Sequence, residues 1–364
     1  MRITEVESIV ADVPFRQPFV VWRGSVPAKR HVYLRIATDA GFTGWGEASP
    51  FLYYAPETAQ GIHAMLTSFI ASELLGRDPR DVRRAMMALA AIDGHLMTKA
   101  AVETALWDVL AQAAGLPLFR LLGGAARETV PLTAIVHSGD PASMAGEARD
   151  WVARGFRALK IKIGFGAEMD VAMVAAVRAA VGSEPTIRVD AEEFYAPKQA
   201  LEIGRQLEPC GIELISQPVA LTDWAGMAFL RERLPMPLLA DEGIHAPDDV
   251  ATCASASAAD MVNIKVLKSG GLLASTEMAA ICAVNHLPVL VGSMIETGIG
   301  SLAAAHFAAV TPGVFSTELA GPLLFTDDLL DRPLDIHDGA IWLDESPGLG
   351  RAVDRARLER LRVA

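Results

Sequence analysis

Apolar and polar residues alternate along the first part of the chain, for example in residues 6–13 and 31–38. A period of two is typical of strands that bury one face, so this part predicts an antiparallel sheet. Residues 56–122 instead show apolar positions at helical spacing, and one amphipathic segment runs from Thr98 to Ala114, just before Gly115. Glycine commonly ends helices. Strands followed by helices predict an α+β module at the N-terminus.

From about residue 130 onward, short apolar runs alternate with alanine-rich segments of helical periodicity. The short runs predict strands at residues 132–136, 158–163, 186–189, 212–215, 238–240, 261–264 and 289–291. The segments that follow them predict helices at residues 143–153, 169–181, 198–207, 221–233, 246–254, 271–284 and 301–309. Repeated strand–helix units predict a parallel sheet, and their even spacing favours a closed barrel. In such barrels the chemistry lies at the C-terminal ends of the strands.

The bulk composition narrows the class of protein. The 364 residues are 51% hydrophobic and 21% charged, which is typical of an ordered globular chain. The formal net charge of −12 argues against nucleic acid as a partner, because phosphate binding needs clustered Lys and Arg. The three cysteines are far apart, which argues against a cysteine zinc site and fits a reducing compartment. Acidic residues near the start and the lack of an apolar run of roughly 20 residues indicate a cytoplasmic protein with no membrane partner.

Lys160 and Lys162 stand in the apolar run of residues 156–164. In a strand both side chains point to one face, which brings two like charges together. Each lysine disfavours protonation of the other, and burial acts in the same direction. We therefore expect one lysine to have a lowered pKa and to serve as a general base. The alternative is an edge strand with both lysines in water.

Charged residues follow several of the later predicted strands. They are Asp190 and Glu192 after the third, Asp241 and Glu242 after the fifth, Lys265 after the sixth, and Glu296 after the seventh. Carboxylates that meet at one barrel mouth are costly to bury without a cation. Hard oxygen ligands suit Mg²⁺ or Mn²⁺ better than zinc, so we expect a divalent-metal site.

Motifs spread over nearly the whole chain carry a family resemblance. They are Lys160-x-Lys162, Asp190, Gln217-Pro218, Asp241-Glu242, Lys265 with Gly270-Gly271, and Glu296, supported by Gly44-Trp45-Gly46-Glu47 and Leu121-Leu122-Gly123-Gly124. This set resembles the enolase superfamily, in particular its muconate lactonizing enzyme subgroup, and residues 317–324 are most similar to muconate cycloisomerases. The implied fold is α/β, a modified TIM barrel of the (β/α)7β type with an N-terminal α+β capping domain.

The resemblance also implies how the chain is divided. A capping domain would cover residues 1–125 and a catalytic barrel residues 126–320, while residues 321–364 would return to the cap. Cap loops would then supply specificity and strand ends the chemistry. The family further implies a small-molecule carboxylate substrate and a homo-oligomer.

In the implied chemistry, a metal binds the substrate carboxylate and stabilises an enediolate, while lysines on two faces of the substrate move the proton. Lys162 would be the acid or base on one face and Lys265 its counterpart, with Lys160 lowering the pKa of Lys162. Glu296 is counted with the catalytic residues, and Glu242 would lie near the metal or the substrate. Removing a proton beside a carboxylate builds a second negative charge, which a divalent cation and ammonium groups can stabilise.

One motif departs from the family pattern. Where the family carries Glu-Gln-Pro, with a metal-ligating glutamate, this chain has Ser216-Gln217-Pro218. Glu192 replaces the asparagine that usually lies two residues after the first ligand, and period-2 geometry would place it on the same strand face as Asp190. We therefore predict that Asp190, Glu192 and Asp241 hold the metal, with a water on Ser216. The alternative is a site that has lost its metal.

Four further residues are candidates for the substrate pocket. His137 closes the first predicted barrel strand, and Trp22, Tyr53 and Tyr54 lie in or near cap loops that, by the resemblance, close over the barrel mouth. The sixth strand carries Lys265 and no histidine, which argues against chemistry of the mandelate racemase type.

Three functions remain open on the sequence. The leading hypothesis is a metal-dependent cycloisomerase that lactonises a muconate-like dicarboxylate, which strictly needs one lysine for proton transfer. The second is a racemase or epimerase of N-acyl amino acids or dipeptides, which needs both lysines. Dipeptide epimerases usually carry Asp-x-Asp where this chain has Glu318-Leu319-Ala320. The third is a non-catalytic carboxylate-binding protein, because Ser216 replaces a metal ligand.

Overall fold

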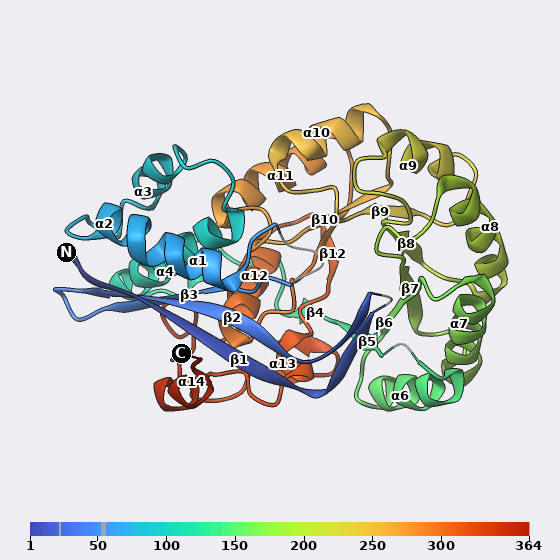
Figure 1. Ribbon diagram of the computed structural model, residues 1–364, viewed down its shortest axis with the longest axis horizontal. Helices are drawn as coiled ribbons and strands as arrows, with labels where there is room; N and C mark the ends of the chain where they lie inside the picture. The colour runs from blue at the N-terminus through green and yellow to red at the C-terminus, as the bar shows by residue number, and fades with distance from the viewer. Residues whose placement is uncertain (22, 52–55, 138, 364) are drawn as a thin grey trace.

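The N-terminal part of the computed structural model is a sheet covered by helices. The structure describes residues 1–21, 23–51, 56–137 and 139–363. Strands β1 (Ile3–Val21), β2 (Gly24–Thr38) and β3 (Thr43–Ala48) pair antiparallel in that order. The helices that follow are α1 (Ala59–Met65), a π-helical turn η1 (Leu66–Ile70), α2 (Ala71–Leu74), α3 (Val82–Leu89), α4 (Leu96–Ala114) and α5 (Leu118–Leu121). Figure 1 shows this α+β module beside the barrel.

Helix α4 packs directly on strand β3. A Cβ atom at Gly44 or Gly46 would overlap the backbone carbonyls of Ala105 or Ala101 on the helix, so glycine is required for this close approach. Gly115 ends α4 in the left-handed conformation with a φ of 67°, as its position after the amphipathic segment predicts.

Parallel strands form the second sheet, and in the described part of the chain eight of them pair in sequence order. They are β5 (Thr133–Val136), β6 (Ala158–Lys162), β7 (Thr186–Asp190), β8 (Leu214–Ser216), β9 (Leu238–Ala240), β10 (Met261–Ile264), β11 (Val289–Val291) and β12 (Val314–Thr317). A parallel bridge joins Leu132 to Thr317, so the first and last strands meet. The predicted modified TIM barrel with an N-terminal cap is confirmed.

Helices surround the barrel strands (Figure 1). They are α6 (Pro141–Ala153), α7 (Ala167–Val181), α8 (Pro197–Leu207) with the 3₁₀ turn η2 (Glu208–Cys210), α9 (Trp224–Arg231), α10 (Pro247–Ser255), α11 (Leu272–Val284) and α12 (Gly298–Val310). Each predicted strand and helix of the barrel has its counterpart within a few residues. The eighth strand, β12, lies outside the strand ranges that the sequence pattern predicts.

The C-terminal segment runs back along the N-terminal sheet. It contains α13 (Gly321–Leu324), β13 (Ile336–His337), β14 (Ala340–Ile341) and α14 (Arg355–Leu361), and β14 also pairs with β4 (Val130–Pro131). The amide of Thr326 donates to the carbonyl of Pro14, and that of Val363 to the carbonyl of Val10, at 2.9 Å each. The domain boundaries near residues 125 and 320 stay predictions.

Among the helices of the described ranges, none combines the length and the apolar character that crossing a membrane requires.

Candidate active site

The two lysines of β6 point to the same, inner face and meet carboxylates there. Lys160 is 3% exposed, and its Nζ lies 2.8 Å from Asp190 Oδ2 and 2.6 Å from Glu318 Oε2. The Nζ atom of Lys162 lies 2.7 Å from the same Asp190 oxygen and 2.5 Å from Glu192 Oε1. Asp190 is the register partner of Lys162 on β7, which explains why one carboxylate serves both ammonium groups.

These ion pairs decide the protonation of the lysines. Burial alone would lower the pKa of Lys160 and of Lys162, but the surrounding carboxylates raise both values above the usual range for lysine. The expected lowering of a lysine pKa is therefore wrong for this pair. Opposite charges in direct contact with each ammonium outweigh both the neighbouring lysine and the burial.

A second charge cluster forms around Asp241, after β9. Its Oδ1 lies 2.7 Å from Lys265 Nζ and 3.3 Å from Lys268 Nζ, and its Oδ2 accepts a hydrogen bond of 2.8 Å from Asn263 Nδ2. The side chain of Gln217 accepts from the amide of Asp241 at 3.0 Å and so fixes the end of β9. Lys268 and Asn263 were not predicted, although Asn263 shares a strand face with Lys265 and could have been found by that alternation.

The two clusters open into one pocket. In the described part of the chain it is lined by Phe19, Phe51, Lys162, Glu192, Glu242, Lys265, Ser293, Met294 and Ile295. β6 and β10 are separated by three strands in the sheet order, so Lys162 and Lys265 approach the pocket from across the barrel. Leu214, Leu239 and Leu290 form a separate buried apolar cluster within the barrel strands.

Glu192 reaches the pocket by a different geometry from the expected one. The strand β7 ends at Asp190, and Glu192 has a left-handed φ of 44°. The backbone turn, rather than strand alternation, directs its carboxylate to Lys162. Left-handed conformations of non-glycine residues are strained and are often found at functional sites.

Two other predicted residues lie close to these carboxylates with unused polar atoms. The Oγ of Ser216 is buried and has no hydrogen-bond partner among the described residues, and the same holds for Oε2 of Glu242. Burial, followed by the charges of Asp241 and Asp190, raises the pKa of Glu242 to about 8. Glu242 lines the pocket, whereas Ser216 lies at the end of β8 beside Asp190.

Glu296 and His137 are placed differently. The Oε1 of Glu296 accepts from the amide of Met294 at 3.0 Å, and the buried side chain is not among the described residues that line the pocket. His137 Nδ1 lies 2.7 Å from Glu147 Oε1, and the imidazole ring is 6.1 Å from the ring of Phe19, a residue of the pocket wall. The predicted residues Trp22, Tyr53 and Tyr54 lie outside the described residues.

The oxygen donors fit a hard divalent cation in kind. Asp190 and Glu192 follow β7, and Asp241 and Glu242 follow β9. Ser216 ends β8 between these two strands, and its hydroxyl has no hydrogen-bond partner among the described residues. Within the described ranges, no three His, Cys, Asp or Glu side chains are gathered as metal ligands. Asp190 and Glu192 instead contact Lys162, and Asp241 contacts Lys265, so metal binding would require these three carboxylates to turn away from the lysines.

Comparisons with known proteins find matches over nearly the whole chain. Residues 3–123 match the family model for the mandelate racemase / muconate lactonizing enzyme N-terminal domain, and residues 143–357 match the enolase C-terminal domain-like model. The chain is 34% identical over 368 residues to muconate cycloisomerase 1-2 of Acinetobacter lwoffii, covering 100% of this chain and 96% of that protein.

Two further relatives differ in their activities. The chain is 33% identical to the L-Ala-D/L-Glu epimerase of Bacillus subtilis, over 96% of both chains. It superposes with a TM-score of 0.96 on the muconate lactonizing enzyme of Pseudomonas fluorescens complexed with muconolactone, at 34% identity and over 100% of this chain and 99% of that one.

Proposed function

We propose that this protein, which belongs to the mandelate racemase and muconate lactonizing enzyme family of the enolase superfamily, lactonises a muconate-like dicarboxylate. The chain is an isomerase of that superfamily. Proton abstraction chemistry is common to the superfamily members that it matches. In the proposed reaction, one carboxylate oxygen adds to the distant double bond, and a proton is added to the carbon beside the other carboxylate.

One observation carries the proposal: Lys162 and Lys265 line one pocket from opposite sides of the barrel. A substrate held between them presents one face to each amine. Either ammonium can deliver a proton to the carbon beside the carboxylate, or the amine can remove it in the reverse direction. Phe19, Phe51 and Met294 supply apolar walls that exclude water from this carbon.

The residues Asp190, Glu192 and Asp241 would hold a divalent metal ion, Mg²⁺ or Mn²⁺. When bound, the cation would stabilise the negative charge that develops on the substrate carboxylate. Lys160 contributes an ammonium that keeps Asp190 ionised, because its charge and that of Lys162 hold the pKa of Asp190 below its usual range despite burial.

A racemase or epimerase is the second candidate, since the presence of both lysines on the pocket also suits proton transfer on two faces. Glu318 makes a dipeptide substrate less suitable. Its carboxylate is buried and paired with Lys160 at 2.6 Å, at the position where dipeptide epimerases usually carry the first acid of Asp-x-Asp. The non-catalytic alternative is set aside, because the chain is an isomerase of the family.

Turnover of cis,cis-muconate, muconolactone and N-succinyl amino acids with Mg²⁺ or Mn²⁺ tests the proposal. Muconate or its lactone should be converted, and Lys162→Ala should reduce kcat by about 10²-fold or more, which is typical of losing a general acid or base. Lys198→Ala, at an exposed lysine of α8, is the matched control and should keep full activity. Undiminished turnover in Lys162→Ala would contradict the assigned role.

Solvent deuterium distinguishes the two candidate reactions. Lactonisation should place one deuterium on one face of the carbon beside the carboxylate. Exchange into both enantiomers of an N-succinyl amino acid, lost in Lys162→Ala and in Lys265→Ala alike, would instead favour racemisation.

A further inference from the structure

The segment between β11 and α12 forms one wall of the lysine pocket. Ser293, Met294 and Ile295 line the pocket, and Ile295 has a φ of 58°. A β-branched residue rarely adopts this left-handed conformation, because its branched side chain crowds the backbone. Contacts from other parts of the molecule must therefore stabilise this wall.

Lys29 makes such contacts from strand β2. Its side chain is 3% exposed, and its Nζ donates to Ser49 Oγ at 2.6 Å, to the carbonyl of Met294, and to that of Ile295 at 3.3 Å. Ser49, which follows β3, places its hydroxyl 3.2 Å and 3.0 Å from the same two carbonyl oxygens. The N-terminal module thus holds two consecutive peptide groups of the barrel.

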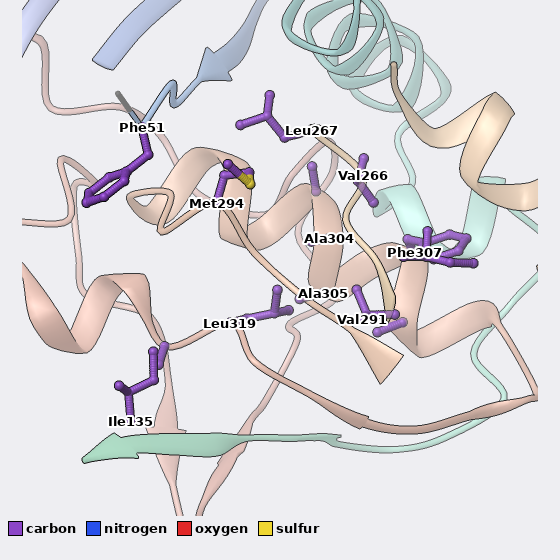
Figure 2. Close-up of a cluster of buried hydrophobic side chains, with 14 of the residues drawn as sticks. Phe51, Ile135, Val266, Leu267, Val291, Met294, Ala304, Ala305, Phe307 and Leu319 are labelled. Carbon is purple, nitrogen blue, oxygen red and sulfur yellow. The ribbon is translucent and has the colours of Figure 1, made fainter. Parts of the chain in front are cut away.

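The same ammonium also contacts a pocket-lining residue of the cap, Phe51. It lies 5.2 Å from the centroid of the Phe51 ring, and Phe51 lines the pocket together with Met294. Both side chains belong to the apolar cluster drawn in Figure 2. Lys29 therefore lies where the wall from the cap and the wall from the barrel meet.

A charged group at this position is costly, which argues for a specific role. The three hydrogen-bond acceptors named above are neutral oxygens, and an apolar side chain would fill the space without the cost of desolvation. Burial lowers the pKa of Lys29 to about 7. The charges of Glu296 and Glu47 act in the opposite direction and raise this pKa, whereas the charge of Lys265 lowers it further. Simple core packing does not account for a buried lysine here.

We propose that Lys29 is a positioning residue, which fixes residues 293–295 against Phe51 and so sets the shape of the lysine pocket without touching the substrate. The inference rests on the proposed function, because it takes this pocket as the place where the substrate binds. In this proposal the N-terminal module supports the pocket through the contact of Lys29 with the carbonyls of Met294 and Ile295.

Amide hydrogen exchange of the full-length protein tests the inference without a substrate. Lys29→Met removes the amine at similar length. The amides of residues 294–297 should then exchange about tenfold faster, since the hydrogen bonds from Nζ to the carbonyls of Met294 and Ile295 are lost. Arg30→Met is the matched control: Arg30 is exposed on the same strand and pairs with Asp12 at 2.6 Å. It should leave these amides unchanged.

Unchanged exchange of residues 294–297 in Lys29→Met would overturn the proposal. Equal acceleration in all barrel strands would also overturn it, because that result indicates a global loss of stability. If Lys29→Met does not fold, Ser49→Ala replaces it and should accelerate exchange in the same segment alone; unchanged exchange there counts against the proposal.

Kinetics supply the second readout. With muconate or muconolactone, Lys29→Met should lower kcat/KM about tenfold while the thermal unfolding midpoint is kept or raised, as for removal of a buried charge. An unchanged kcat/KM would overturn the positioning role. If neither compound is turned over by the parent protein, the proposed function fails, and the exchange measurement still tests Lys29.

Discussion

Two residues set the number of carboxylates beside Asp190. Ser216 is the register partner of Asp190 on β8 and brings only a neutral hydroxyl. Glu192 brings a carboxylate from the turn after β7 and places it 2.5 Å from Lys162. Ser216 supplies no negative charge, but the pocket still has a second carboxylate near Asp190, because Glu192 provides one from the turn after β7.

Glu192→Gln should weaken Mg²⁺ binding at least about tenfold, because an amide oxygen is a poorer ligand than a carboxylate for a hard cation. Isothermal titration calorimetry measures this affinity directly. Glu193→Gln is the control, since the Glu193 carboxylate accepts from the amide of Leu221 at 2.7 Å and the amide oxygen of glutamine can do the same. Equal Mg²⁺ affinity in Glu192→Gln and the parent would exclude Glu192 as a ligand.

At the scale of elements, the contact between β3 and α4 has no room for side chains. Gly44 and Gly46 face the helix backbone at Ala105 and Ala101, and the amide of Trp45 between them donates to Asp108 Oδ2 at 3.0 Å. This contact joins the N-terminal sheet to the longest helix of the cap. It therefore fixes the strand whose end carries Glu47 and Ser49.

Gly46→Ala should lower the free energy of unfolding by several kcal/mol. Overpacking of a core usually costs about 1–3 kcal/mol, and the cost should be higher here because the added Cβ meets the helix backbone at Ala101, which moves less readily than a side chain. Urea denaturation measures the change. Gly313→Ala is the control, because a Cβ atom at Gly313 meets nothing within 4 Å. A midpoint for Gly46→Ala equal to that of the control would show that the helix can move away at little cost.

At the scale of the whole molecule, buried carboxylates of the N-terminal module accept hydrogen bonds from amides in the first turns of barrel helices. Glu47 accepts from the amides of Thr297 and Gly300 at the start of α12, at 2.8 Å and 2.9 Å. Glu103 accepts from the amide of Leu273 at the start of α11, at 2.8 Å. Negative charge at a helix N-terminus is favourable, so these contacts bind the cap to the barrel.

Glu103 makes stability depend on pH. Its burial raises the pKa to about 7, above the value near 4.5 of the unfolded chain. The folded state therefore holds an extra proton between about pH 4.5 and pH 7, and stability falls as the pH rises through this window.

Glu103→Gln has no titrating group at this position and so lacks this loss of stability. The free energy of unfolding of the variant, relative to that of the parent, should therefore rise by a few kcal/mol from pH 4.5 to pH 8. Urea unfolding at both pH values measures the gain. Glu277→Gln, on the exposed face of α11, should show no such change. A difference between Glu103→Gln and the parent that does not vary with pH would contradict the assigned titration.

The sequence by itself determined the order of strands and helices, the barrel, and the identities of the lysines and carboxylates at the strand ends. These features follow from periodicity, which each segment carries locally. Only the tertiary structure decided that Asp190 pairs with Lys160 and Lys162 and raises their pKa values, and that the Glu296 carboxylate accepts from the amide of Met294. It also decided the contacts of Lys29 with residues 294 and 295. Such interactions depend on distances between strands remote in sequence, and no local pattern encodes those distances.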